Sequence, residues 1–63
     1  MPIAVIHLLE GRDEAKKRAL LLEVSNAISR TLDAPIESVR VIVQEMPNAN
    51  FAIGGKIAKD LGR

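Results

Sequence analysis

Residues 2–9 read Pro-Ile-Ala-Val-Ile-His-Leu-Leu and predict a β-strand at the start of the fold. Successive side chains of a strand point to opposite faces, which gives two apolar sets: Ile3, Val5 and Leu9 on one side, and Ala4, Ile6 and Leu8 on the other. A strand with two apolar faces is typical of one that is covered on both sides. Pro2 fits its first position, where no ladder hydrogen bond is required.

A long amphipathic helix is predicted next, after a turn at residues 10–12. Asp13 is a suitable N-cap, and the helix should run from about residue 14 to residue 32. Its apolar stripe falls at i, i+4, i+7, i+8 and i+12, as Leu20, Val24, Ala27, Ile28 and Leu32. Pro35 should end the helix, because it disfavours helical geometry at Ala34.

A second strand is predicted over residues 38–45, Ser-Val-Arg-Val-Ile-Val-Gln-Glu. A strand, a helix and another strand form a β-α-β unit, so the two strands should be parallel with a right-handed crossover. The remaining chain predicts a C-terminal hairpin around residues 49–55 and a final helical turn over residues 56–61. We therefore expect an α+β fold and one domain over residues 1–63.

The composition predicts an oligomer. A chain of 63 residues buries only about 60% of its unfolded surface, yet 48% of these residues are apolar. No cysteine is present, so disulfides cannot stabilise the fold. One helix also covers only one face of a two-stranded sheet, which leaves the other apolar face bare. We expect an obligate homo-oligomer in which other copies cover that face.

Several classes of function are disfavoured. Nine basic and eight acidic residues are interspersed, without the basic stripe of a nucleic-acid-binding protein. The apolar stretch of residues 3–9 is too short to span a bilayer, so we expect a cytoplasmic protein without a membrane partner. His7 alone cannot build a metal site, and Gly54-Gly55 lacks the spacing of a phosphate-binding loop. We expect neither a metal nor a cofactor.

Pro2 is the first candidate for chemistry. If Met1 is removed, Pro2 carries a free secondary amine, and apolar surroundings would lower its pKa toward neutrality. Phe51 could supply the apolar wall. Taken alone, Pro2 is also explained as a residue that begins a strand.

Two arginines support a catalytic interpretation. Arg12 lies at the helix N-terminus, where a cation opposes the macrodipole, and Arg40 interrupts an apolar strand. Both suit carboxylate recognition, because the planar guanidinium binds a carboxylate through two hydrogen bonds. Pro2 and Arg40 should share one end of the sheet, whereas Arg12 follows the far end, roughly 25–30 Å away. A pocket that contains all three must lie between subunits.

The whole chain resembles the 4-oxalocrotonate tautomerase family of the tautomerase superfamily, without gaps. The matching residues are Pro2-Ile3-Ala4, Ile6-His7, Leu9-Glu10-Gly11-Arg12, Glu23-Val24-Ser25, Ala27-Ile28-Ser29-Arg30, Leu32-Asp33-Ala34-Pro35, Ser38-Val39-Arg40-Val41, Glu45-Met46, Phe51 and Ile53-Gly54-Gly55. The resemblance implies a hexamer built as a trimer of dimers, no cofactor, and a role in aromatic hydrocarbon catabolism.

The resemblance also implies the chemistry. Pro2 would be the general base that moves a proton within a 2-hydroxymuconate-type dienol, giving the α,β-unsaturated 2-oxo acid. Arg40 would bind the C1 carboxylate and the 2-oxygen, Arg12 the far carboxylate, and Phe51 would keep the pocket dry. A dehalogenase of this superfamily would be expected to have an arginine at the position of Leu9 and an acidic residue at the position of Ile53. Both positions are apolar here, which disfavours the activation of water.

Two alternatives remain open from the sequence. One is a keto–enol tautomerase of arylpyruvates or other monoacids, which would hardly use Arg12. The other is a non-catalytic subunit that completes a hetero-hexamer with another small chain.

Overall fold

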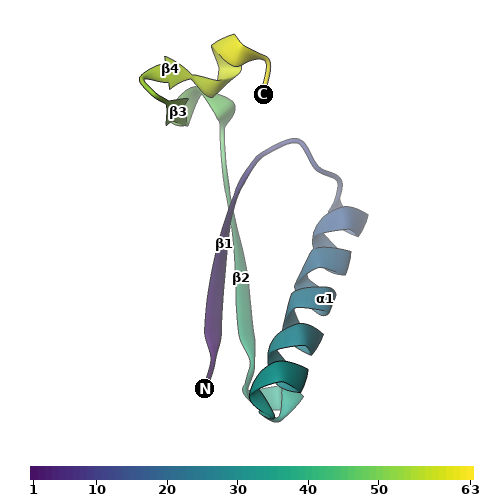
Figure 1. Ribbon diagram of the computed structural model, residues 1–63. Helices are drawn as coiled ribbons and strands as arrows, with labels where there is room; N and C mark the ends of the chain where they lie inside the picture. The colour runs from purple at the N-terminus through teal and green to yellow at the C-terminus, as the bar shows by residue number, and fades with distance from the viewer.

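The computed structural model describes residues 1–63 as an elongated β-α-β unit followed by a small hairpin (Figure 1). The elements in chain order are β1 (Ile3–Leu9), α1 (Glu14–Leu32), β2 (Arg40–Met46), β3 (Ala52–Ile53) and β4 (Lys56–Ile57). Short 3₁₀ turns occupy Ile36–Ser38, Asn48–Asn50 and Ala58–Leu61. The predicted α+β class, the order of the elements and the C-terminal hairpin are confirmed.

Strands β1 and β2 pair in parallel over their full lengths, from Ile3 opposite Arg40 to Leu9 opposite Met46. The ladder continues by one hydrogen bond at each end. At the beginning of the strands the Arg40 amide donates to the main-chain oxygen of Pro2 at 2.9 Å, and beyond their far end the Glu10 amide donates to that of Met46 at 2.9 Å. The register therefore fixes which residues meet at either end of the sheet.

Helix α1 has the predicted bounds, and the side chains at its ends explain why. The Asp13 carboxylate accepts a hydrogen bond from the Lys16 amide at 2.8 Å, as an N-cap does. At the other end Asp33 adopts the left-handed conformation, with φ of 52°, and its amide donates to the main-chain oxygen of Ser29. Pro35 then prevents continuation of the helix.

An ion pair joins the helix to the second strand. The Lys17 ammonium lies 2.8 Å from the Glu45 carboxylate, and this hydrogen bond raises the pKa of Lys17 above its ordinary value. The pair connects the first turns of α1 to the far end of β2. None of the helices combines the length and the apolar character needed to cross a bilayer.

The structure corrects both boundaries of the second strand and one boundary in the tail. The second strand begins at Arg40 rather than at Ser38, because the amide and hydroxyl of Ser38 both bond to the main-chain oxygen of Pro35, at 2.9 and 2.8 Å. Residues 36–38 therefore form a 3₁₀ turn, and the strand ends at Met46 rather than Glu45. In the tail, residues 56–57 were expected in a helical turn but form β4, which pairs antiparallel with β3.

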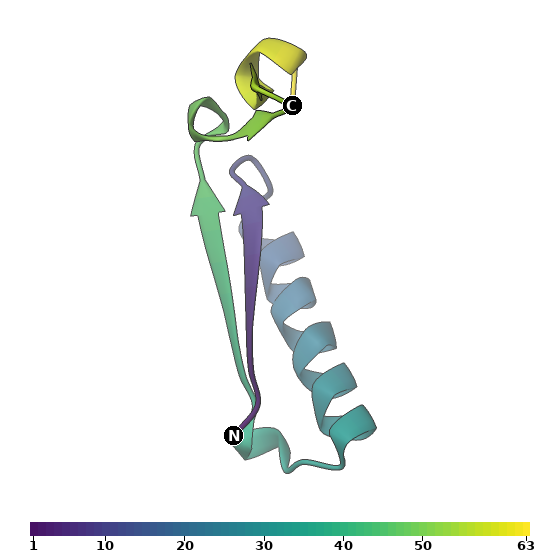
Figure 2. The same cartoon turned by 60° about the vertical axis from the view of Figure 1, so that its left-hand side comes forward.

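The two faces of the β1–β2 sheet differ in their cover. Helix α1 lies on one side, mainly against β2, and no element covers the other (Figures 1 and 2). On the uncovered face Ile3, Val5 and Ile42 remain 63%, 49% and 50% exposed. The predicted bare apolar face is thus present in the chain.

The dimensions also indicate that the chain is only part of a folded unit. Its Cα radius of gyration is 14.5 Å, whereas a compact domain of this length has a radius of about 11 Å. Its accessible surface is 4796 Å², against about 4000 Å² for a folded monomer of this mass. Ala58 is the only fully buried residue. A stable core therefore requires additional copies.

We predict that Val5→Lys dissociates the assembly, because a lysine on the uncovered face cannot be buried against another apolar sheet without a partner. Sedimentation velocity at low micromolar concentration should give an oligomer for the wild type and smaller species for the variant. Glu23→Lys, on the exposed side of α1, is the control and should keep the wild-type size. A Val5→Lys protein of wild-type size and helix content would contradict this account.

Candidate active site

Pro2 and Arg40 meet at the beginning of the two parallel strands. The main-chain hydrogen bond from Arg40 to Pro2 is 2.9 Å long, and Ile3 lies opposite Arg40 in the ladder. Pro2 is half-buried, and Arg40 is exposed on the uncovered face of the sheet. The expectation that these two residues share one end of the sheet is confirmed.

The Arg40 guanidinium is oriented by main-chain oxygens rather than by an acidic side chain. Its Nη1 atom donates to the main-chain oxygen of Glu37 at 2.7 Å and more weakly to that of Val39 at 3.4 Å. No carboxylate lies within ion-pair distance of it. Because a guanidinium has five N–H donors, several of them stay available for an anion.

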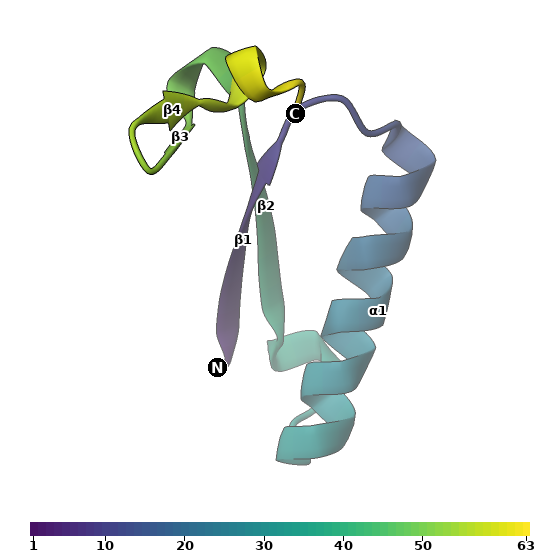
Figure 3. The ribbon, with the colours of Figure 1, turned by 45° about the horizontal axis from the view of Figure 1, so that its top comes forward.

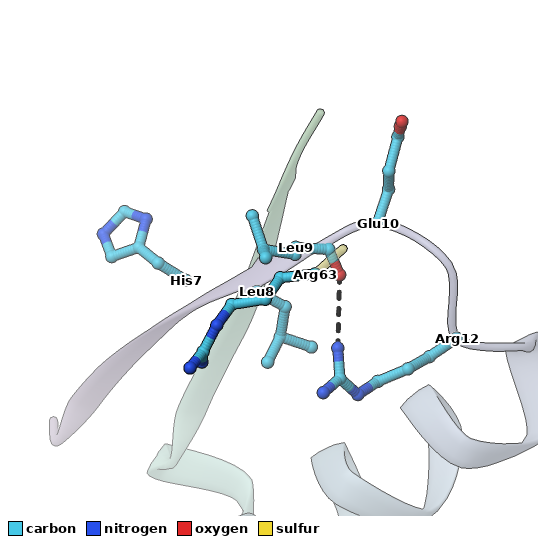
Figure 4. A pocket seen from close by; sticks show the side chains of 6 residues that line it. All are labelled: His7, Leu8, Leu9, Glu10, Arg12 and Arg63. Atoms are coloured by element: carbon cyan, nitrogen blue, oxygen red, sulfur yellow. Dashed lines mark hydrogen bonds between the residues drawn. The ribbon is translucent and has the colours of Figure 1, made fainter. Parts of the chain in front are cut away.

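Arg12 and Leu9 lie at the opposite end of the sheet, beside a hollow of about 410 Å³ (Figure 4). The residues that line this hollow are His7, Leu8, Leu9, Glu10, Arg12 and Arg63. The Arg12 Nη1 atom donates to the main-chain oxygen of Leu9 at 3.3 Å, which leaves the other guanidinium donors free of protein partners. A cationic group at the edge of a partly apolar hollow suits a carboxylate that carries a hydrocarbon chain.

Phe51 and Ile53 belong to the hairpin segment that extends beyond the far end of the sheet (Figure 3). They are 39% and 42% exposed. Large apolar side chains are more often buried, so these two lack full cover within their own chain. The Ala58 amide donates to the main-chain oxygen of Phe51 at 2.7 Å and so anchors the hairpin. Both side chains remain available to contact another subunit.

The candidate residues therefore form two separate groups. Pro2 and Arg40 lie at one end, while Leu9 and Arg12 lie at the other, next to the hairpin with Phe51. The seven residues of β1 alone span about 23 Å at about 3.3 Å per residue. One chain does not bring the two groups together. A pocket between subunits that contains both stays a prediction.

Arg63 is the one cationic residue of the hollow that sequence reasoning missed. It lies far from Arg12 in the chain, and no local pattern marks it. Its position depends on Gly62, which adopts a positive φ of 75° and turns the chain back toward Ala58. The Gly-Arg dipeptide after a predicted helical turn was the only available signal.

The family model described as "Tautomerase enzyme" matches residues 2–61 of the chain. The chain therefore belongs to the tautomerase family, and it is an enzyme of the isomerase class.

Curated relatives are similar to the chain in sequence over their full lengths. The chain is 62% identical over 63 residues to a 2-hydroxymuconate tautomerase of Stutzerimonas stutzeri, with all of both chains covered. A 2-hydroxymuconate tautomerase of Pseudomonas putida is 57% identical, again with both chains covered completely.

Solved structures show the same fold. A 4-oxalocrotonate tautomerase isozyme from Methylibium petroleiphilum superposes with a TM-score of 0.94 at 47% identity, covering 98% of this chain and 100% of that one. A heterohexamer 4-oxalocrotonate tautomerase from Chloroflexus aurantiacus superposes with a TM-score of 0.93 at 34% identity, covering 97% and 98%.

We predict that two impaired variants restore turnover of 2-hydroxymuconate when they are mixed. Pro2→Ala and Arg12→Ala each damage one group, and a site shared by two subunits becomes intact when it takes Pro2 from one variant and Arg12 from the other. Unfolding and refolding them together in equal amounts should make about a quarter of the sites intact for random assembly. Each variant refolded alone is the control, and the mixture should exceed the mean of the two activities. A mixture that only equals that mean would place the site within one chain.

Proposed function

We propose that this chain converts 2-hydroxymuconate-type dienols into α,β-unsaturated 2-oxo acids, with the Pro2 amine as general base. The observation that carries the proposal is the direct hydrogen bond between the main chains of Pro2 and Arg40, which holds the base next to a residue whose guanidinium has no acidic partner. The full-length relatives that are named 2-hydroxymuconate tautomerases support the substrate class.

The base requires the removal of Met1. With Met1 attached, the Pro2 nitrogen is part of a tertiary amide and has no basic lone pair. Met1 is 77% exposed, so an aminopeptidase can reach it. The amine that results is covered further when another subunit packs on this end of the sheet, and desolvation disfavours its protonated form. A neutral amine near pH 7 can accept a proton.

The reaction moves one proton within the substrate. The 2-hydroxyl group loses a proton, carbon 5 gains one, and the double bonds shift so that the carbonyl at carbon 2 becomes conjugated with the C3–C4 double bond. Pro2 carries the proton. The intermediate dienolate bears negative charge on its 2-oxygen, which a fixed guanidinium stabilises far better in a water-poor pocket than in bulk water.

Each remaining candidate residue has one role in this proposal. Arg40 binds the C1 carboxylate and the 2-oxygen, and Arg12 binds the far carboxylate. Phe51, Leu9 and Ile53 form apolar walls that exclude water. The chain acts as a single domain without a cofactor.

The site is completed in a homo-oligomer, which we propose to be a hexamer arranged as a trimer of dimers. The uncovered apolar face, the large radius of gyration and the exposed hairpin support an assembly of several copies. The heterohexamer from Chloroflexus aurantiacus supports six as the number of subunits. Purification of this chain alone as an inert hexamer would instead favour a non-catalytic subunit of a mixed assembly.

We predict that Arg12→Ala impairs turnover of 2-hydroxymuconate and leaves turnover of phenylenolpyruvate close to that of the wild type. The first substrate has a far carboxylate for Arg12, and the second has none. The loss in kcat/KM for the diacid should be about 10- to 100-fold, as for a charge-assisted bidentate hydrogen bond. Equal losses for both substrates would contradict the assigned role, and a wild type that accepts only phenylenolpyruvate would contradict the diacid substrate.

The pH profile of kcat/KM tests the base. We predict activity that rises as pH increases through a limb near neutrality, because the amine must be deprotonated in the free enzyme. Pro2→Ala should lower kcat by about 100-fold while sedimentation stays unchanged. Intact mass should be lower than that of the full sequence by one methionine. A limb above about pH 9 would exclude a desolvated amine as the base.

A further inference from the structure

We infer that Arg63 acts with Arg12 as a second guanidinium of the subsite for the far carboxylate, and that this pair makes the enzyme selective for dicarboxylates. The inference rests on the proposed function, and it adds a residue for which neither the sequence nor the comparisons give a role. Three observations carry it: the position of Arg63, the lack of competing acids, and the hydrogen bonds that hold its main chain.

The position of Arg63 places its charge in the same hollow as that of Arg12. Both residues line the 410 Å³ hollow at the far end of β1, together with Leu8 and Leu9. Figure 4 shows the two guanidinium groups on the same side of strand β1. In the inferred subsite one carboxylate accepts hydrogen bonds from both flexible side chains, while its hydrocarbon chain contacts the leucines.

No acidic side chain neutralises this pair. The ion pairs of the chain are Lys17 with Glu45 and Arg18 with Glu14, and neither involves the hollow. Glu10 is the one acidic residue of the lining, but its carboxylate points away from both guanidinium groups (Figure 4). A bound carboxylate would supply the negative charge that the acidic side chains of the chain do not.

The main chain of Arg63 is held in place. Its amide donates to the main-chain oxygen of Ala58 at 3.0 Å, and the Asn48 side-chain amide donates to the main-chain oxygen of Arg63 at 3.0 Å. Ala58 is the fully buried residue of the chain, so this anchor is its best-packed point. Carboxylate binding then has to order only the Arg63 side chain and not its main chain, and the entropic cost of binding is lower for that reason. Asn48 is accordingly a positioning residue.

The pair has a consequence for selectivity. A monocarboxylate uses Arg40 near the base and leaves the hollow without an anion, so the loss of Arg63 leaves its KM unchanged. A dicarboxylate places its second carboxylate between Arg12 and Arg63. Arg63 should therefore affect substrate binding more than the chemical step, because the far carboxylate lies remote from the proton transfer.

The experiment compares Arg63→Ala, Arg63→Lys and Asn48→Ala with the wild type. Lys59→Ala is the matched control, because it removes one positive charge from the same turn without lining the hollow. We measure kcat and KM for 2-hydroxymuconate and for phenylenolpyruvate. We also measure equilibrium binding of trans,trans-muconate and of sorbate, which share a six-carbon diene and differ by one carboxylate. Neither ligand has a hydroxyl group to tautomerise, so binding is measured independently of turnover.

We expect Arg63→Ala to raise KM for the diacid and Kd for muconate by about 3- to 10-fold, the range of a partly solvated ion pair. Its kcat should change by less than about twofold, and phenylenolpyruvate and sorbate should be unaffected. Arg63→Lys should recover part of the loss, since it keeps the charge but not the planar fork. Asn48→Ala should shift muconate binding in the same direction by a smaller factor, and Lys59→Ala should resemble the wild type.

Two outcomes overturn the inference, and a third separates it from the proposed function. Unchanged muconate binding in Arg63→Ala, with assembly intact by sedimentation, excludes a role for Arg63. Equal losses of muconate affinity in Arg63→Ala and Lys59→Ala would mean that Arg63 acts only through general electrostatic attraction. A wild type that binds muconate more tightly than sorbate through Arg63, yet does not turn over 2-hydroxymuconate, would support the subsite and contradict only the proposed function.

Discussion

The parallel register of β1 against β2 is the constraint on which the rest of the molecule depends. Parallel strands need a crossover, and α1 provides it along the full length of the sheet. Because both strands run in the same direction, their first residues, Pro2 and Arg40, meet at one end. The residues that follow the strands, which include Arg12 and the hairpin, gather at the other. A shift by one residue would turn Arg40 toward the helix and remove it from Pro2.

The same arrangement makes stability and the site inseparable from assembly. A two-stranded sheet with one helix cannot form a closed core, and a single fully buried residue shows how little this chain covers by itself. The apolar face that needs another copy for stability is the face on which Arg40 lies. Packing against that face therefore also removes water from the neighbourhood of the base, so that one set of contacts serves both purposes.

Much of the fold could be predicted from the sequence because its signals are local. The apolar run in residues 2–9, the cap at Asp13 and the stop at Pro35 each act within a few residues, and the structure has them in place. The errors arose where the structure depends on particular hydrogen bonds that the apolar pattern does not reveal. Ser38 bonds to the turn instead of joining the strand, and residues 56–57 pair with β3 instead of forming a helical turn. Arg63 escaped attention for the same reason, since Asn48 holds it from fifteen residues away.

The division of the candidate site between two kinds of structure suggests how its chemistry and its selectivity are separated. Pro2 and Arg40 are fixed by the hydrogen-bonded ladder, so their geometry changes only if the sheet changes. Arg12, Phe51 and Arg63 lie on connecting segments, which tolerate substitution far better than strands do. Folding itself therefore constrains the geometry at the end of the sheet that holds the base. The opposite end can alter its charge or shape, and hence the acids it accepts, without disturbing the proton transfer.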